Sequence, residues 1–245
     1  MSRLHRPKAG LWIRVWVSIL YPLDGLFFKI RWQHLERVPA PSQGGVLIAI
    51  NHVSQVDTVL TARLVWQSGR VPRFMIKAGI FDWPIVGYMM KGAGQIPVYR
   101  GTADAAHSLR DAVSALERGE AVVIYPEGTT TKDPANWPMQ SKTGIARLVL
   151  LAPDIPVVPV GQWGAHRMGG PSLRRLGRRR TAQASIGEPL DLSRFRGKEP
   201  TPALLREITD EIMSAVREQV AELRGEPAPD TFFVPKRVYV DKGRR

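Results

Sequence analysis

The sequence predicts a single α/β domain, a mixed β-sheet flanked by helices, with a pair of apolar helices at its N-terminal end. Short runs of branched apolar residues, such as residues 46–50 (VLIAI) and 121–125 (AVVIY), are typical of buried strands. They alternate with longer stretches in which apolar residues recur at helical spacing. No internal repeat or linker interrupts the 245 residues, a length that suits one large domain. Such an alternation is typical of α/β architecture.

The N-terminal segment, residues 1–31, is where we expect a membrane-associating helical pair. Residues 9–30 are strongly apolar but include Arg14, Pro22 and Asp24, and they carry no small-residue cleavage motif of a signal peptide. A bilayer-spanning helix needs about 20 predominantly apolar residues, and a charge at its centre costs a few kcal/mol. We therefore expect two short helices that break at Pro22 and lie in the membrane interface. The alternative is a helical pair that packs into the protein core.

The following region, residues 32–224, carries the alternating elements of the domain. Thr201 suits the N-cap of a last helix with Pro202 at its first position, and Gly119 ends an earlier helix. The chain beyond the last helix is rich in proline and charge, so we expect residues 225–245 to form a loosely ordered basic tail. Strands are expected at residues 46–50, 71–76, 95–99, 121–125, 155–160 and 181–187, and helices at 56–67, 81–91, 102–119, 145–151 and 202–223.

Composition narrows the partners and the chemistry. The chain has 35 Lys and Arg against 22 Asp and Glu, a formal charge of +13. This excess implies an anionic partner, which is a nucleic acid, an anionic membrane surface or a phosphorylated substrate. Nucleic acid is the least favoured, because no helix-turn-helix, RRM or zinc-finger signature is present. The absence of cysteine excludes disulfides and thiolate catalysis, and the five histidines lack metal-ligand spacing, so no metal site is expected.

The clearest candidate for chemistry is the pair His52 and Asp57 in the block NHVSQVD. On a straight helix, residues five apart lie about 140° from each other and do not share a face. They can meet if His52 lies on the loop after a strand and Asp57 begins the next helix. A carboxylate bonded to one ring nitrogen fixes the tautomer and leaves the other nitrogen free to accept a proton. The alternative is an aspartate that caps its helix beside an incidental histidine.

Three further blocks follow in order, and together the four carry a resemblance. They are NHVSQVD (51–57), GQIPVYR (94–100), PEGTTTK (126–132) and VVPVG (157–161). Over about residues 32–190 the sequence resembles the glycerolipid acyltransferase family, in particular the lysophosphatidic acid acyltransferases. That family shares NHxxxxD, a block around I-x-V-x-R, an EGT turn and a VPV strand.

The resemblance implies the transfer of a long acyl chain from acyl-CoA to the sn-2 hydroxyl of lysophosphatidic acid, which gives phosphatidic acid. His52 is then the general base and Asp57 its orienting partner. No G-x-S-x-G nucleophile motif is present, so direct attack is expected, without a covalent acyl-enzyme and without a metal or other cofactor. The expected partners are acyl-CoA, a lysophospholipid and an anionic membrane surface, and no nucleic acid. The expected location is the cytoplasmic face of the cell membrane, with peripheral or monotopic attachment.

Other residues take expected roles from their positions in the family blocks. Arg100 is the expected ligand of the acceptor phosphate, with Lys77 and Lys132 as further candidates. The basic stretch at residues 173–180 (LRRLGRRR) either holds CoA phosphates, contacts anionic lipid or is a solvated loop. Lys142 lies at a recurring family position, and we assign it no chemistry. A turn is expected to shape the acceptor site, formed by Glu127, Gly128, Thr129 and Thr130.

One position departs from the family pattern. Many members carry arginine directly after EGT, where it helps to hold the phosphate, whereas this chain has Thr130. Threonine donates a hydrogen bond but carries no charge. A second reading is therefore an acyltransferase of the same family that acts on glycerol 3-phosphate, another lysophospholipid or a glycolipid. A third is a basic membrane- or nucleic-acid-binding protein without enzymatic activity.

Overall fold

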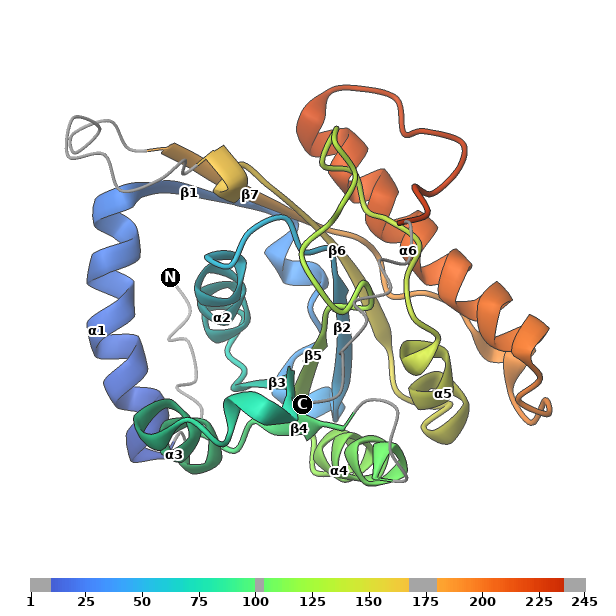
Figure 1. Cartoon of the computed structure of the whole chain (residues 1–245), viewed down its shortest axis with the longest axis horizontal. Coiled ribbons are helices and arrows are strands. Elements are labelled where there is room, and N and C mark those ends of the chain that lie inside the picture. The colour runs from blue at the N-terminus through green and yellow to red at the C-terminus, as the bar shows by residue number, and fades with distance from the viewer. Residues whose placement is uncertain (1–9, 100–103, 168–179, 236–245) are drawn as a thin grey trace, which may run out of the picture.

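The architecture is a seven-stranded sheet with helices on both faces (Figure 1). The computed structural model describes residues 10–99, 104–167 and 180–235. The strands are β1 (Phe28–Gln33), β2 (Val46–Ile50), β3 (Pro72–Lys77), β4 (Ile96–Val98), β5 (Ala121–Ile124), β6 (Val157–Trp163) and β7 (Arg180–Ile186). The α-helices are α1 (Leu11–Phe27), α2 (Asp57–Gln67), α3 (Pro84–Gly92), α4 (Ala105–Glu117), α5 (Gly144–Leu151) and α6 (Pro202–Arg224).

The sheet is mixed, which confirms the predicted fold class. Its strand order is β1-β7-β6-β2-β5-β3-β4. The strands β6, β2, β5, β3 and β4 are parallel, β7 is antiparallel to β6, and β1 is parallel to β7. Parallel neighbours need crossover connections, and helices supply most of them here. The carboxyl ends of the five parallel strands consequently meet at one edge of the sheet.

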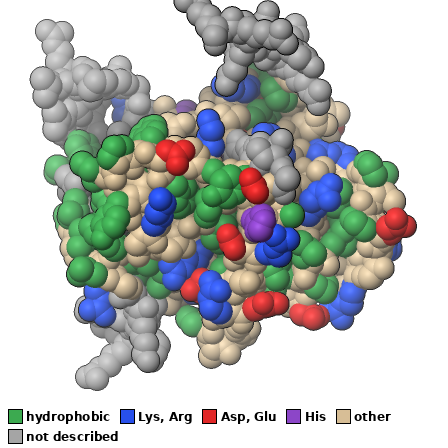
Figure 2. Space-filling view, turned by 60° about the horizontal axis from the view of Figure 1, so that its bottom comes forward, with side chains coloured by type: hydrophobic (Ala, Val, Ile, Leu, Met, Phe, Trp, Pro, Cys, Tyr) green, Lys and Arg blue, Asp and Glu red, His purple; other side chains and the backbone are tan. Residues whose placement is uncertain are grey.

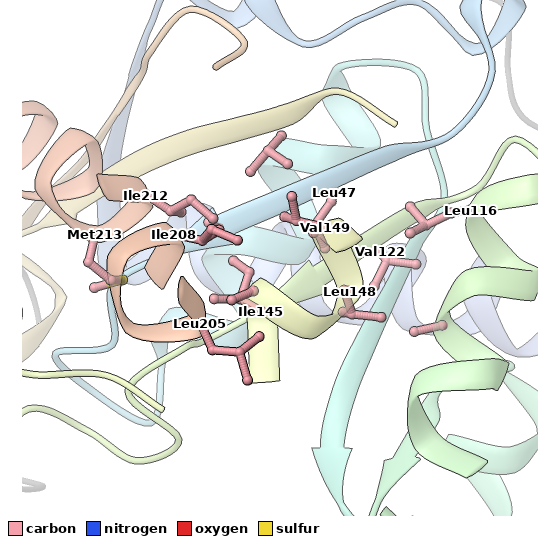
Figure 3. Close-up of a cluster of buried hydrophobic side chains, with 14 of the residues drawn as sticks. Leu47, Leu116, Val122, Ile145, Leu148, Val149, Leu205, Ile208, Ile212 and Met213 are labelled. Carbon is pink, nitrogen blue, oxygen red and sulfur yellow. The ribbon is translucent and has the colours of Figure 1, made fainter. Parts of the chain in front are cut away.

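Helices bury both faces of the central strands. All five residues of β2 are buried, as expected for a parallel strand that is covered on both sides. The larger core lies under α4, α5 and α6, and Figure 3 shows its leucine, isoleucine and valine side chains packed between these helices and the sheet. A second core lies on the opposite face, where Leu64 and Val65 of α2 pack on Ile48 and Val123.

The N-terminal region differs from the expected helical pair. A single helix, α1, runs from Leu11 to Phe27 and passes through Pro22. Proline removes one backbone hydrogen bond but does not end a helix whose other contacts hold it. Tyr21 donates a hydrogen bond to the carbonyl of Arg63 on α2 (3.2 Å), and Ile13 is buried. Among the described residues no helix is both long and apolar enough to cross a membrane.

Strand β1 was not expected, and it crosses the proposed boundary between residues 31 and 32. It pairs with β7 along its whole length, from Phe28 opposite Arg180 to Gln33 opposite Ser185. Its sequence FKIRWQ alternates apolar and polar residues, the pattern of a half-buried strand. The apolar residues that precede Phe28 made this alternation hard to recognise in the sequence. The division into a membrane-associating segment and a catalytic domain stays a prediction.

The C-terminal elements agree with the expected last helix. The hydroxyl of Thr201 accepts a hydrogen bond from the backbone N–H of Leu204 at 3.2 Å, which confirms the N-cap of α6. The described part of the tail is attached to the domain, because the N–H of Gln140 donates to the carbonyl of Phe233 at 2.9 Å. The rest of the expected loose tail, residues 236–245, lies outside the described residues.

Candidate active site

Two of the four sequence blocks directly follow the carboxyl ends of neighbouring parallel strands. NHVSQVD follows β2, PEGTTTK follows β5, and VVPVG is the first part of β6, which lies beside β2. The edge strand β4 carries the middle of the GQIPVYR block. Ligands of open α/β sheets bind at this edge, outside the ends of the strands. The blocks are therefore separated in sequence and neighbours in space.

His52 and Asp57 form the predicted pair. Nδ1 of His52 lies 3.1 Å from Oδ2 of Asp57. His52 lies on the loop after β2, and Asp57 is the first residue of α2, so the loop turns back between them. The same Oδ2 accepts the backbone N–H groups of Val53 (2.6 Å) and Ser54 (2.7 Å), which fix the carboxylate in place. The Asp57 side chain is fully buried, whereas 12% of the His52 side chain is exposed, so a substrate can reach the imidazole.

Glu127 has a structural role that could not be predicted from its place in the sequence. One carboxylate oxygen accepts the backbone N–H of His52 at 2.8 Å, and the other accepts the backbone N–H of Met139 at 3.1 Å. Only 2% of Glu127 is exposed. Its side chain therefore holds the His52 loop from the protein interior and does not face a substrate. Burial raises the pKa of Glu127 to about 8; the two N–H donors oppose this shift, and the charge of Asp57 adds to it.

A hydrogen-bonded pair behind the histidine was missed by the sequence analysis. Asn51 donates to the backbone carbonyl of Gln162 (3.1 Å) and accepts from its backbone N–H (2.7 Å). Gln162 in turn donates from its side chain to the carbonyl of Asn51 at 2.5 Å. Both residues are buried, so these bonds lock the end of β2 to β6. A glutamine within the apolar run of β6 was the available signal.

Tyr125 forms the wall behind the imidazole. Its ring stacks on His52 with 4.3 Å between centroids, and its hydroxyl donates to Thr61 on α2 at 3.0 Å. Burial raises the pKa of Tyr125, and the charge of Asp57 raises it further, so the phenol stays protonated. The stacked ring and the buried carboxylate of Asp57 together restrict His52 to one orientation.

The remaining predicted residues are dispersed. Lys77 is exposed at the end of β3, and Lys132 is exposed beyond the EGT turn, where its backbone N–H contacts the sulfur of Met139. Gly128 adopts a φ of 71°, which glycine accepts without strain, while Thr129 is exposed and Thr130 is half-buried. Two predicted sites, Arg100 and residues 173–179 of the basic stretch, lie outside the described residues.

Two cavities adjoin this edge, one on each face of the sheet. The first has a volume of about 120 Å³ and is almost entirely apolar, with walls from α1, α2, β3 and α3. The second has a volume of about 360 Å³ and lies between the ends of β4 and β5 and the starts of α4 and α5. The described residues contain no cluster of three or more His, Cys, Asp or Glu side chains that could hold a metal ion. The apolar cavity approaches the His52–Asp57 pair through Thr58, which follows Asp57 in the sequence, and through Phe74, whose ring stacks on Tyr125.

Known proteins are similar to this chain in sequence and in fold. The chloroplast 1-acyl-sn-glycerol-3-phosphate acyltransferase of Arabidopsis thaliana is 30% identical over 166 residues, which cover 64% of this chain and 44% of that protein. A lyso-ornithine lipid O-acyltransferase of Pseudomonas aeruginosa is 31% identical over 139 residues, which cover 50% of this chain and 52% of that protein. The chain thus spans about half the length of these relatives.

A solved structure and a family model complete the comparison. The crystal structure of the 1-acyl-sn-glycerophosphate acyltransferase of Thermotoga maritima has a TM-score of 0.62 at 20% identity, covering 89% of this chain and 81% of that chain. The two proteins therefore share a fold. The sequence model of the acyltransferase family matches residues 29–163, more than half of the chain. On these grounds the chain belongs to the acyltransferase family.

Proposed function

We propose that the protein is a 1-acylglycerol-3-phosphate O-acyltransferase that moves a long acyl chain from acyl-CoA to the sn-2 hydroxyl of lysophosphatidic acid. The observation that carries this proposal is the 3.1 Å contact between His52 Nδ1 and Asp57 Oδ2 at the end of β2. Relatives whose names describe acyl transfer to 1-acyl-sn-glycerol 3-phosphate support the choice of acceptor. The apolar cavity lined by Phe74, whose ring stacks on Tyr125, is suited to an acyl chain.

In the proposed reaction His52 acts through Nε2. Asp57 holds the proton on Nδ1, so Nε2 is free to accept the proton of the acceptor hydroxyl. The hydroxyl oxygen attacks the thioester carbonyl carbon, and the carbonyl electron pair moves onto oxygen. When the tetrahedral intermediate collapses, the C–S bond breaks and CoA leaves as a thiol, with the proton that His52 returns. General-base assistance of this kind contributes about 10²–10⁴-fold to a rate.

A second candidate acceptor is a lyso-ornithine lipid. It is favoured by the similarity to the Pseudomonas aeruginosa enzyme and by Thr130, which stands where the family often has the arginine that binds phosphate. An acceptor without a phosphate has no use for that arginine. Both acceptors present a hydroxyl to the same base, so the two candidates differ in the headgroup site and not in the mechanism.

The proposed location of the protein is an anionic membrane surface on the cytoplasmic side. The protein attaches to this surface without crossing the membrane. Helices α1 and α3 meet where Trp12 contacts Tyr88 edge-on, with 5.4 Å between the ring centroids. Figure 2 shows hydrophobic side chains gathered on the left of this face, with Lys and Arg side chains among them. Aromatic residues beside cations are suited to the lipid headgroup region. The exposed apolar residues on these helices include Leu11, Ile19, Leu26, Ile85 and Tyr88.

Loss of the base tests the proposed function. The purified His52→Ala chain should lose release of CoA from palmitoyl-CoA by about 10²–10⁴-fold when lysophosphatidic acid is present, with an unchanged thermal unfolding midpoint. The matched control is His107→Ala, because His107 is exposed on α4 and bonds to Arg110. Full activity of the His52 variant would remove His52 as the base.

A panel of acceptors separates the two candidates. Lysophosphatidic acid, lyso-ornithine lipid, glycerol 3-phosphate and a neutral monoacylglycerol are each offered with labelled palmitoyl-CoA. The highest kcat/KM for lysophosphatidic acid supports the proposal, and the highest value for lyso-ornithine lipid supports the second candidate. Thioester cleavage that does not depend on any acceptor would contradict both.

A further inference from the structure

We propose that Arg224, the last residue of α6, is a positioning residue for His52 that acts through the loop between β5 and α5. Its guanidinium binds the loop, and the loop binds the main chain of His52. This inference rests on the proposed function, because its main effect is on the rate of acyl transfer. Arg224 lies outside the four sequence blocks and outside residues 29–163, which the family model matches.

The guanidinium of Arg224 contacts two tryptophan rings, a loop carbonyl and a carboxylate. Its Cζ lies over the ring of Trp137, 4.0 Å from the centroid, and over the ring of Trp163 at 4.4 Å. Nη1 donates to the carbonyl oxygen of Ala135 at 2.7 Å, and Nη2 donates to Glu226 at 2.8 Å. Only 10% of the Arg224 side chain is exposed. These contacts require a planar cation with fixed donor directions, which only arginine supplies.

Trp137 connects the guanidinium to His52 through the loop that follows the EGT turn. Figure 1 shows this loop in yellow-green beside the red end of α6. The carbonyl of Trp137 accepts a hydrogen bond from the hydroxyl of Thr131 at 2.7 Å. The backbone N–H of Thr131 donates to the carbonyl of His52, also at 2.7 Å. Arg224 is thus linked to the main chain of the histidine through two residues of the loop.

Trp163 connects the guanidinium to the residue before His52. It is the last residue of β6 and follows Gln162, which exchanges hydrogen bonds with Asn51. Asn51 directly precedes His52 in the sequence. Arg224 therefore joins two segments that are distant in the sequence, and each of them is hydrogen-bonded to the end of β2 where the histidine begins its loop.

Stabilisation of the end of α6 does not by itself account for these contacts. A cation is favourable in the last turn of a helix, and Glu226 gives Arg224 a local ion pair. The helix end is already closed by Gly225, which has a φ of 65° and donates its N–H to the carbonyl of Ala221 at 2.9 Å. The bond from Arg224 to a carbonyl 89 residues away and the two ring contacts are additional to this cap. They hold the loop.

Steady-state kinetics of the full chain test the positioning role. Arg224→Met keeps the apolar stem but removes the guanidinium, so the loop loses its bond to α6. We expect kcat with palmitoyl-CoA and lysophosphatidic acid to fall about 10- to 100-fold, the effect of a small misplacement of a catalytic group. Both KM values should change less than about twofold, because binding of the substrates is not what is lost. A normal kcat, or a rise in KM without a fall in kcat, would overturn the proposal.

The matched control is Arg194→Met. The Cζ of Arg194 also lies over an aromatic ring, that of Phe195 at 4.4 Å, and its guanidinium pairs with Glu211. These contacts lie at the start of the segment that leads into α6, and none of them involves the loop after the EGT turn. Arg194→Met should therefore keep kcat within about twofold. An equal fall in both variants would show a general effect of losing a surface cation and would overturn the proposal.

A double-mutant cycle tests whether Arg224 acts through Trp137. Trp137→Leu removes the ring that the guanidinium covers, and it should lower kcat in the same direction as Arg224→Met. If the two residues act in one chain of contacts, the double variant should lose less than about twofold more than the weaker single variant. Losses that multiply would show independent effects and would overturn the proposed route.

Amide hydrogen exchange separates this inference from the proposed function, because it needs no catalysis. The N–H groups of Thr131 and Met139 donate to His52 and Glu127, so their protection reports whether the loop stays in place. In Arg224→Met their exchange should become about 10-fold faster or more, while the amides of α2 keep their protection. Unchanged protection of the two loop amides would overturn the inference. Absence of acyl transfer by the unmutated chain would overturn the proposed function alone.

Trp137→Leu gives a second measurement if Arg224→Met does not fold. This variant keeps the bond from the guanidinium to Ala135 and the contact with Trp163, so its effect on the fold should be smaller. Faster exchange of the two loop amides, with protected α2 amides, supports the proposal. Exchange that matches the unmutated chain would overturn it.

Discussion

The side chain of Glu127 accepts the backbone N–H of His52 at 2.8 Å, although 75 residues separate them in the sequence. Its second oxygen accepts the N–H of Met139, so one buried carboxylate holds both the histidine loop and the far side of the EGT loop. Together with the bond of Asp57 to the imidazole, this contact fixes the main chain and the side chain of His52 separately. The loop and the ring of His52 are thus held by two carboxyl side chains with different tasks.

Glu127→Gln should lower kcat about 10- to 100-fold and leave KM for both substrates nearly unchanged. An amide has one acceptor oxygen, so one of the two backbone N–H groups then faces an NH₂ group, which costs about 1–3 kcal/mol. Steady-state kinetics with palmitoyl-CoA and lysophosphatidic acid measure the effect. The matched control is Glu117→Gln, which changes an exposed glutamate on α4. A variant with normal kcat would show that the His52 main chain needs no such support.

Stability should depend on pH through the same carboxyl group. Burial raises the pKa of Glu127 from 4.5 to about 8, so the folded chain binds an extra proton between these values. The resulting stabilisation is complete below 4.5 and is lost as the pH rises through about 8. Over this interval the free energy of unfolding should fall, relative to Glu127→Gln, by about 1.4 kcal/mol per pH unit. Urea denaturation of both chains at a series of pH values measures this, and parallel curves would contradict it.

The contact between His52 and Asp57 could be predicted because its determinants are local. An apolar strand directly before His52 and an apolar helix directly after Asp57 are visible in the sequence, and the loop between them is too short to separate the two side chains. An aspartate is also favourable in the first turn of a helix. The fold class followed from the same alternation of strands and helices.

Contacts that join distant segments could not be predicted in the same way. The bond from Glu127 to His52 and the exchange between Asn51 and Gln162 depend on which strands are neighbours, and β2 lies between β5 and β6 only in the folded sheet. The low helix propensity of proline predicted a break at Pro22, but α1 continues through this residue. Packing of α1 on α2 outweighs the one hydrogen bond that proline removes.

Arg70 provides a test of stability away from the site. The residue is 2% exposed, and burial lowers the pKa of its guanidinium. Arg70→Met keeps the apolar stem but leaves buried carbonyls without donors, so we expect a loss of about 2–5 kcal/mol in the free energy of unfolding. The carbonyls that accept from Arg70 are those of Pro39, Ala40, Gly44 and Gly119.

The control for this variant is Arg118→Met. Arg118 is 61% exposed and pairs with Glu120, and a surface pair contributes at most about 1 kcal/mol. Urea denaturation monitored by tryptophan fluorescence gives both values, and an unchanged slope shows that the unfolded state is comparable. Equal losses in the two variants would show that the buried guanidinium of Arg70 contributes no more to the free energy of unfolding than that of the exposed Arg118.

The apolar cavity makes a prediction about acyl chain length. Phe74 lines this cavity and stacks on Tyr125 with 6.4 Å between ring centroids, and Tyr125 in turn stacks on His52. Val59 lines the same cavity from α2. An acyl chain that enters from the thioester can therefore extend past Tyr125 toward Val59. A larger side chain there shortens the available space.

Val59→Phe should lower kcat/KM for palmitoyl-CoA about 10-fold or more and change the value for octanoyl-CoA less than about twofold. Each methylene excluded from an apolar pocket costs about 1–3 kcal/mol, so only the longer chain is penalised. Competition between the two donors in one reaction measures the ratio directly. Ala203→Phe adds the same ring on the exposed first turn of α6 and should leave the ratio unchanged. If both donors lose activity equally in Val59→Phe, the acyl chain lies elsewhere.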